Sequence, residues 1–256
     1  MLPGFKKAVS VGCFLLVWEG VARSGFLPSE HFPPVAEILI AGRDMLASGE
    51  LAAAEGQTLL RALTGLITTI GLGVGLALLA ARYAVLARMW APVVEIVRSI
   101  PPAALVPLAI FALGLTPKLF IGIIVFAGFG TVYLTALNAL RNVEPVQINA
   151  ARVMGYGRFE TLFRVRLPAA MPAIFSGIRV AAGSVLIASV ASEMLAGKDG
   201  LGFLLFDTAF SMRTREMFAV MLVAALNGIL LNQLVMWARR PFAGWQDALN
   251  RLGESR

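Results

Sequence analysis

Long apolar runs are the feature that most restricts how this chain can fold. A stretch of about 20 mostly apolar residues can cross the hydrocarbon core of a bilayer as a helix. The sequence contains six such stretches, at residues 7–23, 58–82, 91–114, 118–140, 170–195 and 216–238. The composition agrees, since 58% of the 256 residues are hydrophobic and only 14% are charged, against about 25% in soluble domains. We therefore predict an all-α integral membrane protein with six transmembrane helices.

The basic residues indicate the direction in which the chain crosses the membrane. With the N-terminus inside, the inner segments carry thirteen Lys and Arg residues and the outer segments carry five, with Arg23 at a boundary. Loops rich in Lys and Arg stay in the cytoplasm. We therefore predict a multi-pass protein of the bacterial cytoplasmic (inner) membrane with both termini in the cytoplasm. The same asymmetry explains the net charge of +7 without nucleic acid binding.

Several shorter features accompany the spans. The first span follows two lysines, as in a signal peptide, but lacks a small-residue cleavage site, so we interpret it as a retained anchor. Apolar residues recur at helical spacing in residues 35–46, which predicts an amphipathic helix on the outer membrane surface or against the bundle. Residues 196–214 are glycine-broken and too short to cross twice, which predicts a helix in the outer mouth. Gly71 and Gly75 have the spacing of small residues in packed membrane helices.

A basic segment between the fourth and fifth spans is the most specific motif of the chain. It reads INAARVMGYGRFETLFRVRLPAAMPAI over residues 148–174 and contains four arginines. Residues 148–154 hold no helix breaker, Gly155 and Gly157 then stop the helix, and Pro168 restarts the chain into the next span. This order predicts a compact helix–turn–helix protrusion with a small face that a partner's groove could enclose, formed by Ala150, Ala151 and Gly155. The alternative is that the arginines only keep the loop inside.

The spacing within this segment resembles a signature of the membrane subunits (permeases) of ATP-binding-cassette importers. That signature is E-A-A, three residues, G, nine residues, I, one residue, L-P. Here Asn149 replaces the Glu and Val165 replaces the Ile, and all spacings are kept. In that family the segment is a coupling helix that docks into a cleft on the ATPase. The resemblance places this role on Asn149, Ala150, Ala151, Arg152, Gly155, Tyr156, Gly157, Arg158, Val165, Leu167 and Pro168.

The resemblance extends over about residues 26–245 and is strongest to the nitrate, sulfonate, taurine and bicarbonate subgroup, in stretches such as VRSIPPAALVPLAIFALGL and ASEMLAGKDGLGFLL. It implies a type I importer permease fold, with five core helices plus an N-terminal one. The implied domains are an anchor with a periplasmic amphipathic segment (1–56), the type 1 transmembrane domain (57–240) and a cytoplasmic tail (241–256). The implied partners are a second permease copy, two ATPases, a periplasmic or lipid-anchored binding protein and membrane lipids. The implied cargo is a small anion.

Ionisable and polar residues inside the predicted spans form a second candidate site. Such groups are costly in lipid and usually face a cavity or pair with each other. They could line an anion path, together with carbonyls freed by the prolines. Alternatively, Arg98 pairs with Glu95, Arg179 extends to the inner interface and the prolines only kink a helix. Glu193 could bind the glycine-rich segment that follows it, or a gate. The candidate pathway residues are Arg98, Pro101, Pro102, Arg179, Ser184, Ser189 and Glu193.

Catalytic groups and cofactor sites are not expected in this chain. One cysteine, Cys13, and one histidine, His31, provide neither a clustered metal site nor a nucleophile–base pair. The phosphate-binding pattern G-x-x-x-x-G-K-[ST] does not occur, so ATP and Mg would be bound by the partner ATPase. A membrane enzyme and a secondary transporter are the alternative functions. The first lacks the required groups, and the second would commonly show inverted repeats.

Overall fold

The computed structural model describes the backbone of residues 3–24, 28 and 30–254, and side chains from Val9 to Phe242 within those ranges. Every regular element in this part of the chain is helical, so the all-α prediction is confirmed. The elements are α1 (Pro3–Arg23), α2 (Val35–Ala47), α3 (Glu50–Arg82), α4 (Ala84–Ser99), η1 (Pro102–Leu105), α5 (Val106–Leu113), α6 (Pro117–Arg141), α7 (Pro145–Val153), α8 (Arg158–Glu160), η2 (Thr161–Arg166), α9 (Leu167–Ala196), α10 (Leu201–Phe210) and α11 (Thr214–Glu254).

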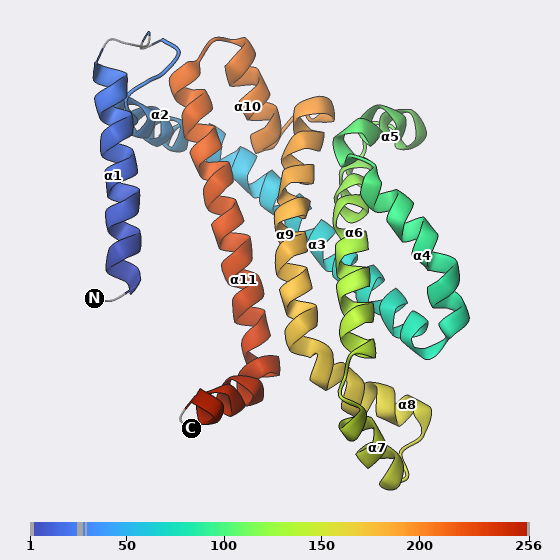
Figure 1. The fold of residues 1–256 in the computed structure, drawn as a ribbon. Coiled ribbons are helices and arrows are strands. Elements are labelled where there is room, and N and C mark those ends of the chain that lie inside the picture. The colour runs from blue at the N-terminus through green and yellow to red at the C-terminus, as the bar shows by residue number, and fades with distance from the viewer. Residues whose placement is uncertain (1–2, 25–27, 29, 255–256) are drawn as a thin grey trace.

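Four long apolar helices form the body of the molecule. Among the described residues, α3, α6, α8–α9 and α11 are each long and apolar enough to cross a membrane, and α4–α5 adds a fifth span if its two bent halves count as one. In Figure 1, α6 and α9 run side by side while α3 crosses behind them. The main hydrophobic core lies between these three helices and includes Tyr133 of α6 and Val185 of α9. All six predicted spans therefore correspond to helices.

Close packing of α3 against α6 depends on glycines that the sequence pattern did not single out. A Cβ added at Gly65 would collide with Ile124, and one added at Gly73 would lie 2.8 Å from Cγ1 of Val132. Gly71 and Gly75 instead have open space around them, so the expectation that they mediate packing is wrong within this chain. The contact stripe follows the buried face of α3, and the pair with G-x-x-x-G spacing lies largely off that face.

The third predicted span is broken rather than continuous. Between α4 and η1–α5 the chain turns by 92°. Ile100 and Pro101 both have extended backbone, with ψ of 124° each. A residue before proline is disfavoured in the helical region, and consecutive prolines extend this restriction over two residues. The predicted kink is therefore confirmed, but a single helix over residues 91–114 is wrong. Pro107, a third proline that the sequence predicts to interrupt this span, does not do so, because it lies in the first turn of α5.

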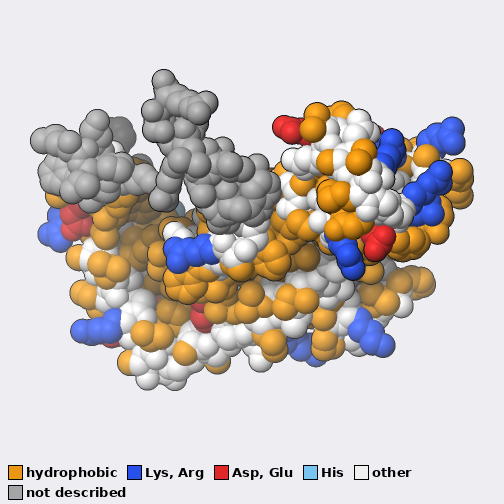
Figure 2. All heavy atoms as spheres, turned by 90° about the horizontal axis from the view of Figure 1, so that it is seen from below, with side chains coloured by type: hydrophobic (Ala, Val, Ile, Leu, Met, Phe, Trp, Pro, Cys, Tyr) orange, Lys and Arg blue, Asp and Glu red, His pale blue; other side chains and the backbone are white. Residues whose placement is uncertain are grey.

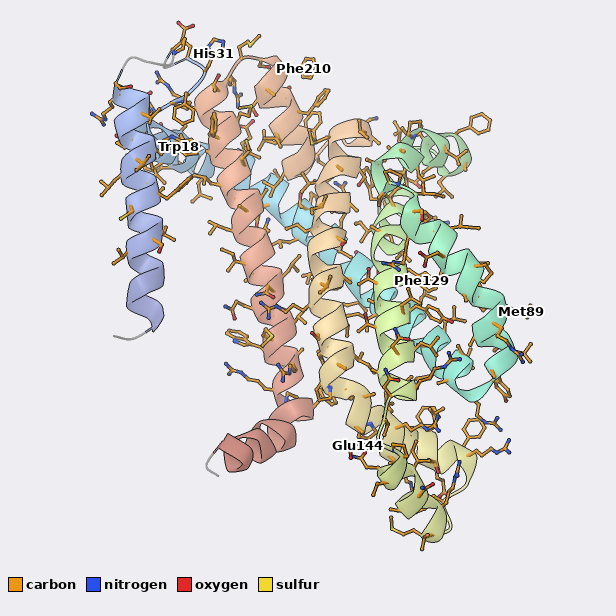
Figure 3. All side chains as sticks on the ribbon, in the orientation of Figure 1. Trp18, His31, Met89, Phe129, Glu144 and Phe210 are labelled. Atoms are coloured by element: carbon orange, nitrogen blue, oxygen red, sulfur yellow. The ribbon has the colours of Figure 1, made fainter. Side chains whose placement is uncertain are left out.

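The N-terminal helix α1 lies at the edge of the bundle (Figure 1) and is joined to it through aromatic packing. It is not among the candidate spans found in the described residues, and its crossing of the membrane remains a prediction. Trp18, which Figure 3 shows between α1 and α2, stacks on Phe32 at 4.7 Å and meets Phe218 of α11 edge-on at 5.5 Å. Glu19 accepts a hydrogen bond from the Val35 amide, which begins α2.

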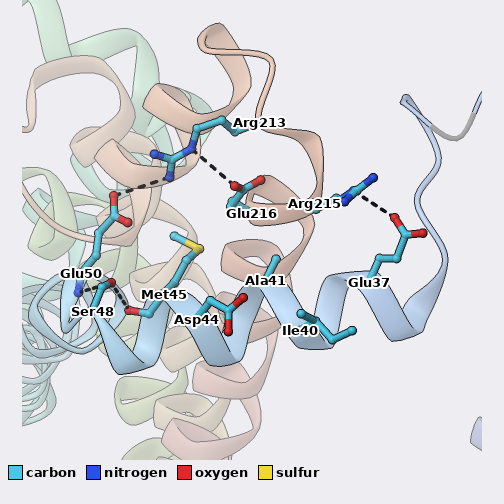
Figure 4. Close-up of a pocket in the computed structure, with 10 residues that line it drawn as sticks. All are labelled: Glu37, Ile40, Ala41, Asp44, Met45, Ser48, Glu50, Arg213, Arg215 and Glu216. Carbon is cyan, nitrogen blue, oxygen red and sulfur yellow. Dashed lines mark hydrogen bonds and ion pairs between the residues drawn. The ribbon is translucent and has the colours of Figure 1, made fainter.

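Helix α2 confirms the predicted amphipathic segment, with a correction to its apolar face. Ile38 and Met45 are buried, whereas Leu39 and Leu46 are exposed. Ion pairs join α2 and the start of α3 to α11 around a cavity of about 380 Å³, shown in Figure 4. They are Arg215 with Glu37 at 2.9 Å and Arg213 with Glu50 at 3.6 Å. The predicted helix in residues 196–214 is α10, which packs between α9 and α11.

Candidate functional site

The basic segment forms a hairpin at the end of the bundle farthest from α10 (Figure 1). We call α7, its turn, α8 and η2 (residues 145–166) the hairpin. Helix α7 ends in a Schellman motif, in which the Tyr156 amide donates to the Ala151 carbonyl and the Gly155 amide donates to the Arg152 carbonyl, both at 3.0 Å. Gly155 has φ of 82°, a left-handed conformation that L-residues with side chains adopt at a cost. The predicted helix–glycine turn–helix form is confirmed.

The second arm of the hairpin runs directly into the membrane-spanning helix α9. The Glu160 carboxylate accepts a hydrogen bond from the Gly157 amide at 3.1 Å and so caps the start of this arm. Helix then continues through residues 158–196, so the expectation that Pro168 restarts the chain is wrong. Proline lacks an amide hydrogen and its ring crowds the carbonyl four residues earlier. The wider π-helical turn η2 ends two residues before Pro168 and includes the carbonyl that the proline ring would crowd, so it accommodates that defect.

The outer surface of the hairpin is apolar as well as basic. Val153 is 89% exposed, and Val146 and Met154 are also exposed. Figure 2 views this end of the molecule and shows hydrophobic and basic side chains together on the lobe at the right. Ala151 is fully buried, so the predicted small face is corrected: only Ala150 and Gly155 of that set face outward. A surface of this kind fits a protein partner, because exposed apolar groups rimmed by charge are typical of interaction sites.

The remaining residues of the predicted coupling motif differ in exposure. Asn149, Arg152, Gly157, Arg158 and Pro168 are exposed. Tyr156, Val165 and Leu167 are half-buried, and Leu167 packs against the main hydrophobic core. The structure thus brings the whole motif into one hairpin and its junction with α9, with exposed and supporting positions interleaved.

A cavity of about 420 Å³ gathers four of the seven predicted pathway residues. We call it the Arg98 cavity. Arg98 reaches it from the end of α4, Pro101 and Pro102 from the break, and Ser184 from α9. Sequence reasoning missed its wall on α6, which includes Phe126 and Thr131. The glycines of α6 nearby, at 128 and 130, were the available signal, because small residues let neighbouring helices and side chains approach.

The position of Arg98 depends on a glycine. A Cβ added at Gly130 would lie 2.5 Å from Cγ of Arg98. The aliphatic part of the arginine therefore packs directly on α6 at Gly130, where any other residue would collide with it. The guanidinium lies 3.6 Å from Glu95, and both side chains are substantially exposed. The expected pairing of Arg98 with Glu95 is confirmed. It does not exclude the arginine from the cavity, since Arg98 also lines it.

Two predicted pathway residues lie outside this cavity. Arg179 donates through Nε to Oδ1 of Asn232 on α11 at 2.5 Å and lines a separate cavity with Arg239 and Arg240. Ser189 is fully buried in the packed face of α9. Neither residue shares a lining with Arg98, so the structure does not join them into one path.

Glu193 is buried in a structural cluster and is absent from the lining of the Arg98 cavity. Its carboxylate accepts hydrogen bonds from Thr58 Oγ1 at 2.7 Å, from Arg61 Nη1 at 3.1 Å and from the Gly202 amide at 3.0 Å. Arg61 also pairs with Asp199. We call these five residues the Glu193 cluster. The expectation that Glu193 binds the glycine-rich segment is confirmed. Sequence reasoning missed Arg61, although an arginine within a predicted span was the signal for it.

The glycines of that segment are explained by the same carboxylate. A Cβ at Gly200, which has φ of 95°, would lie 2.5 Å from the Glu193 carboxyl carbon. One at Gly202 would lie 2.6 Å from Cβ of Glu193. The loop between α9 and α10 and the first turn of α10 can therefore close over Glu193 only with glycine at these positions.

Comparison with known proteins supports the family resemblance that the sequence motifs indicate. Residues 70–243 match the family described as "Binding-protein-dependent transport system inner membrane component". This range contains the Arg98 cavity and the whole hairpin.

Individual relatives and one solved structure extend this likeness. The permease protein SsuC of Bacillus subtilis (strain 168), named for aliphatic sulfonates transport, is 26% identical over 246 residues, covering 96% of this chain and 89% of SsuC. The taurine transport system permease protein TauC of Escherichia coli (strain K12) is 28% identical over 243 residues, covering 92% and 88%. A chain of a bacterial alginate ABC transporter in complex with an alginate-bound periplasmic protein superposes with a TM-score of 0.63 at 14% identity, covering 94% and 96%.

Proposed function

The chain belongs to the family of binding-protein-dependent transport system inner membrane components, and we propose that it forms half of a passage for a small oxyanion. As a permease subunit of an ATP-binding-cassette importer it is a transport protein rather than an enzyme. The observation that carries the proposal about cargo is the Arg98 cavity, where one guanidinium lies among mostly apolar side chains. A cation in such surroundings selects for an anionic partner, because it offers charge-assisted hydrogen bonds.

The size and polarity of the cavity favour a small sulfonate. Its volume of about 420 Å³ is at the lower end of the range for small-molecule sites. Ser184 and Thr131 add hydroxyl groups, and Phe126 and Ile187 add apolar surface. A short alkanesulfonate has both an oxyanion head and an apolar stem. The names of SsuC and TauC support this class of cargo.

A second copy of the chain would complete the passage. Ile187 lines the Arg98 cavity and is 72% exposed, so part of the wall faces outward from the subunit. Phe111, near the same broken span, is 91% exposed. Apolar side chains with this much exposed surface suit burial against another subunit. We propose a homodimer with two copies of the cavity facing a shared path.

The hairpin is the proposed docking element for an ATPase subunit. It combines a left-handed glycine turn with exposed Val153 and Met154 between arginines. The proposed assembly contains two ATPases, which bind ATP and Mg, and a periplasmic or lipid-anchored binding protein. The hairpin and the C-terminal end of α11 lie toward the same end of the molecule in Figure 1, in keeping with both termini in the cytoplasm.

Replacing Arg98 with glutamine is expected to reduce uptake of an anionic substrate roughly ten- to hundredfold. The reason is the loss of a charged hydrogen-bond donor, which is worth about 1.5–3 kcal/mol. The measurement is uptake of radiolabelled taurine, ethanesulfonate and nitrate by the transporter purified with its own partner subunits and reconstituted. Arg179→Gln is the matched control, because Arg179 lies outside the cavity. Equal loss in both variants, or transport of a neutral solute alone, would contradict the anion path.

A further inference from the structure

Four arginines surround a cavity of about 320 Å³ between the hairpin and the end of α3. Arg82 is the last residue of α3, Arg152 and Arg158 flank the turn of the hairpin, and Arg166 ends η2. We call this cavity the arginine pocket. Its other walls include Tyr156, Thr161 and Leu162, and no carboxylate of the described residues lines it. It is distinct from the Arg98 cavity and lies behind the exposed apolar tip of the hairpin.

The positive charge in this pocket has no counterpart among the described residues. No ion pair joins any of the four arginines to a described carboxylate; the acidic group nearest in sequence, Glu160, pairs with Arg164 instead. Nε of Arg82 and Nε of Arg166 are buried without a hydrogen-bond partner. Arg82 is also held over the rings of Tyr83 and Phe159. Buried donors normally have partners, so a ligand that brings acceptor oxygens into the pocket would satisfy these two.

The surroundings of the pocket indicate which anion fits. Arg82 ends a helix that is apolar enough to span a membrane, so the pocket begins at the level where lipid headgroups lie. Leu79 and Val85, three residues before and after Arg82 in sequence, are exposed, and so is Phe159, over whose ring Arg82 is held. An anion with an attached hydrocarbon chain would match both the arginines and the exposed apolar side chains. Arginine forks match the oxygens of a phosphate group in two-point contacts.

We propose that the arginine pocket binds the headgroup phosphate of an anionic phospholipid. The lipid chains lie along the exposed apolar side chains at the end of α3, and the phosphate receives hydrogen bonds from Arg82 and Arg166. The bound lipid ties the hairpin to the end of α3. It thereby gives the hairpin a second anchor besides its continuous connection to α9.

The test is lipid binding by the purified full-length chain in neutral detergent, followed by native mass spectrometry. The probes are dioleoyl phosphatidylglycerol, dioleoyl phosphatidylcholine and inorganic phosphate. We expect phosphatidylglycerol to bind wild type in preference to phosphatidylcholine, and to bind Arg82→Gln/Arg166→Gln at least tenfold more weakly. The control Arg88→Gln/Arg179→Gln removes the same charge outside the pocket and should bind as wild type does. A second pair, Arg152→Gln/Arg158→Gln, changes only exposed side chains and should also weaken binding.

Three results would overturn the proposal. Equal phosphatidylglycerol binding by wild type, both pocket variants and the control would mean that the pocket is not a lipid site. Binding of inorganic phosphate with the same loss in the variants, without a preference for phosphatidylglycerol, would assign the pocket to a free anion. Unchanged lipid binding together with loss of ATPase copurification in the pocket variants would assign the arginines to a protein carboxylate.

Discussion

Replacing Glu193 with glutamine is expected to destabilise the protein by about 3–5 kcal/mol, because it breaks a buried ion pair while leaving the cation in place. Oε1 and Oε2 of Glu193 both accept from donors, so the amide nitrogen of glutamine would face either Arg61 or the Thr58 hydroxyl and the Gly202 amide. Arg61, whose side chain is only 15% exposed, would keep Asp199 as its remaining acid partner. The loop between α9 and α10 should loosen with it.

The measurement is the melting temperature of the full-length chain in detergent, compared with Asp207→Asn. Asp207 lies on α10 and is exposed, so this control removes a carboxylate charge from the same region without breaking a described contact. Equal melting temperatures for the two variants would mean that the Glu193 cluster does not hold the outer end of the bundle together.

Replacing Gly155 with valine is expected to abolish coupled transport while leaving the chain folded in the membrane. Gly155 has φ of 82° and a Cβ there would meet no atom within 4 Å, so the cost is backbone strain and not collision. That strain is about 1–2 kcal/mol for an ordinary residue and more for a β-branched one. It falls on the turn that presents Val153 and Met154. Uptake should fall at least tenfold, and ATP hydrolysis should no longer respond to the loaded binding protein.

The chain offers a matched control for this change. Gly49, in the turn between α2 and α3, has φ of 83° and equally open surroundings. Gly49→Val therefore introduces the same strain at the other end of α3, and uptake should stay near wild type. Gly155→Asn should retain most activity, since asparagine tolerates the left-handed region. Loss of uptake in Gly49→Val and Gly155→Val alike would indicate general damage, and normal coupling in Gly155→Val would argue against a role for the hairpin turn.

Local patterns predicted the helices and the hairpin well because both depend on short-range chemistry. The spans follow from apolar length, and the turn at Gly155 follows from a helix that meets a glycine. The sharp break at Pro101 was foreseen only as a kink, since the angle depends on how α5 packs against α6. The sequence predicts that Pro168 restarts the chain, but the helix continues through it. A π-helical turn before the proline compensates for the missing hydrogen bond and the crowded carbonyl, and local patterns do not reveal such a turn.

The candidate pathway could be predicted only in part, because a polar residue in a span can either line a cavity or be buried between packed helices. Arg98 and Ser184 line one cavity. Ser189 lies only five residues after Ser184, but it does not line that cavity and is fully buried within the bundle. Arg179 donates a hydrogen bond to Asn232, which lies 53 residues away in sequence. Partners at such distances leave no local trace, so the Glu193 cluster and the arginine pocket became visible only in three dimensions.

The central claim is that the hairpin docks on an ATPase subunit, and photo-crosslinking from the hairpin tip tests it most directly. A photoreactive amino acid at Met154, which is exposed on the hairpin, is compared with one at Gly49 near the opposite end of the bundle, in membranes that contain the complete transporter. Illumination should yield an adduct with the ATPase from position 154 and none from position 49. An intact, active transporter that gives no ATPase adduct from position 154, or gives one from position 49, would contradict the claim.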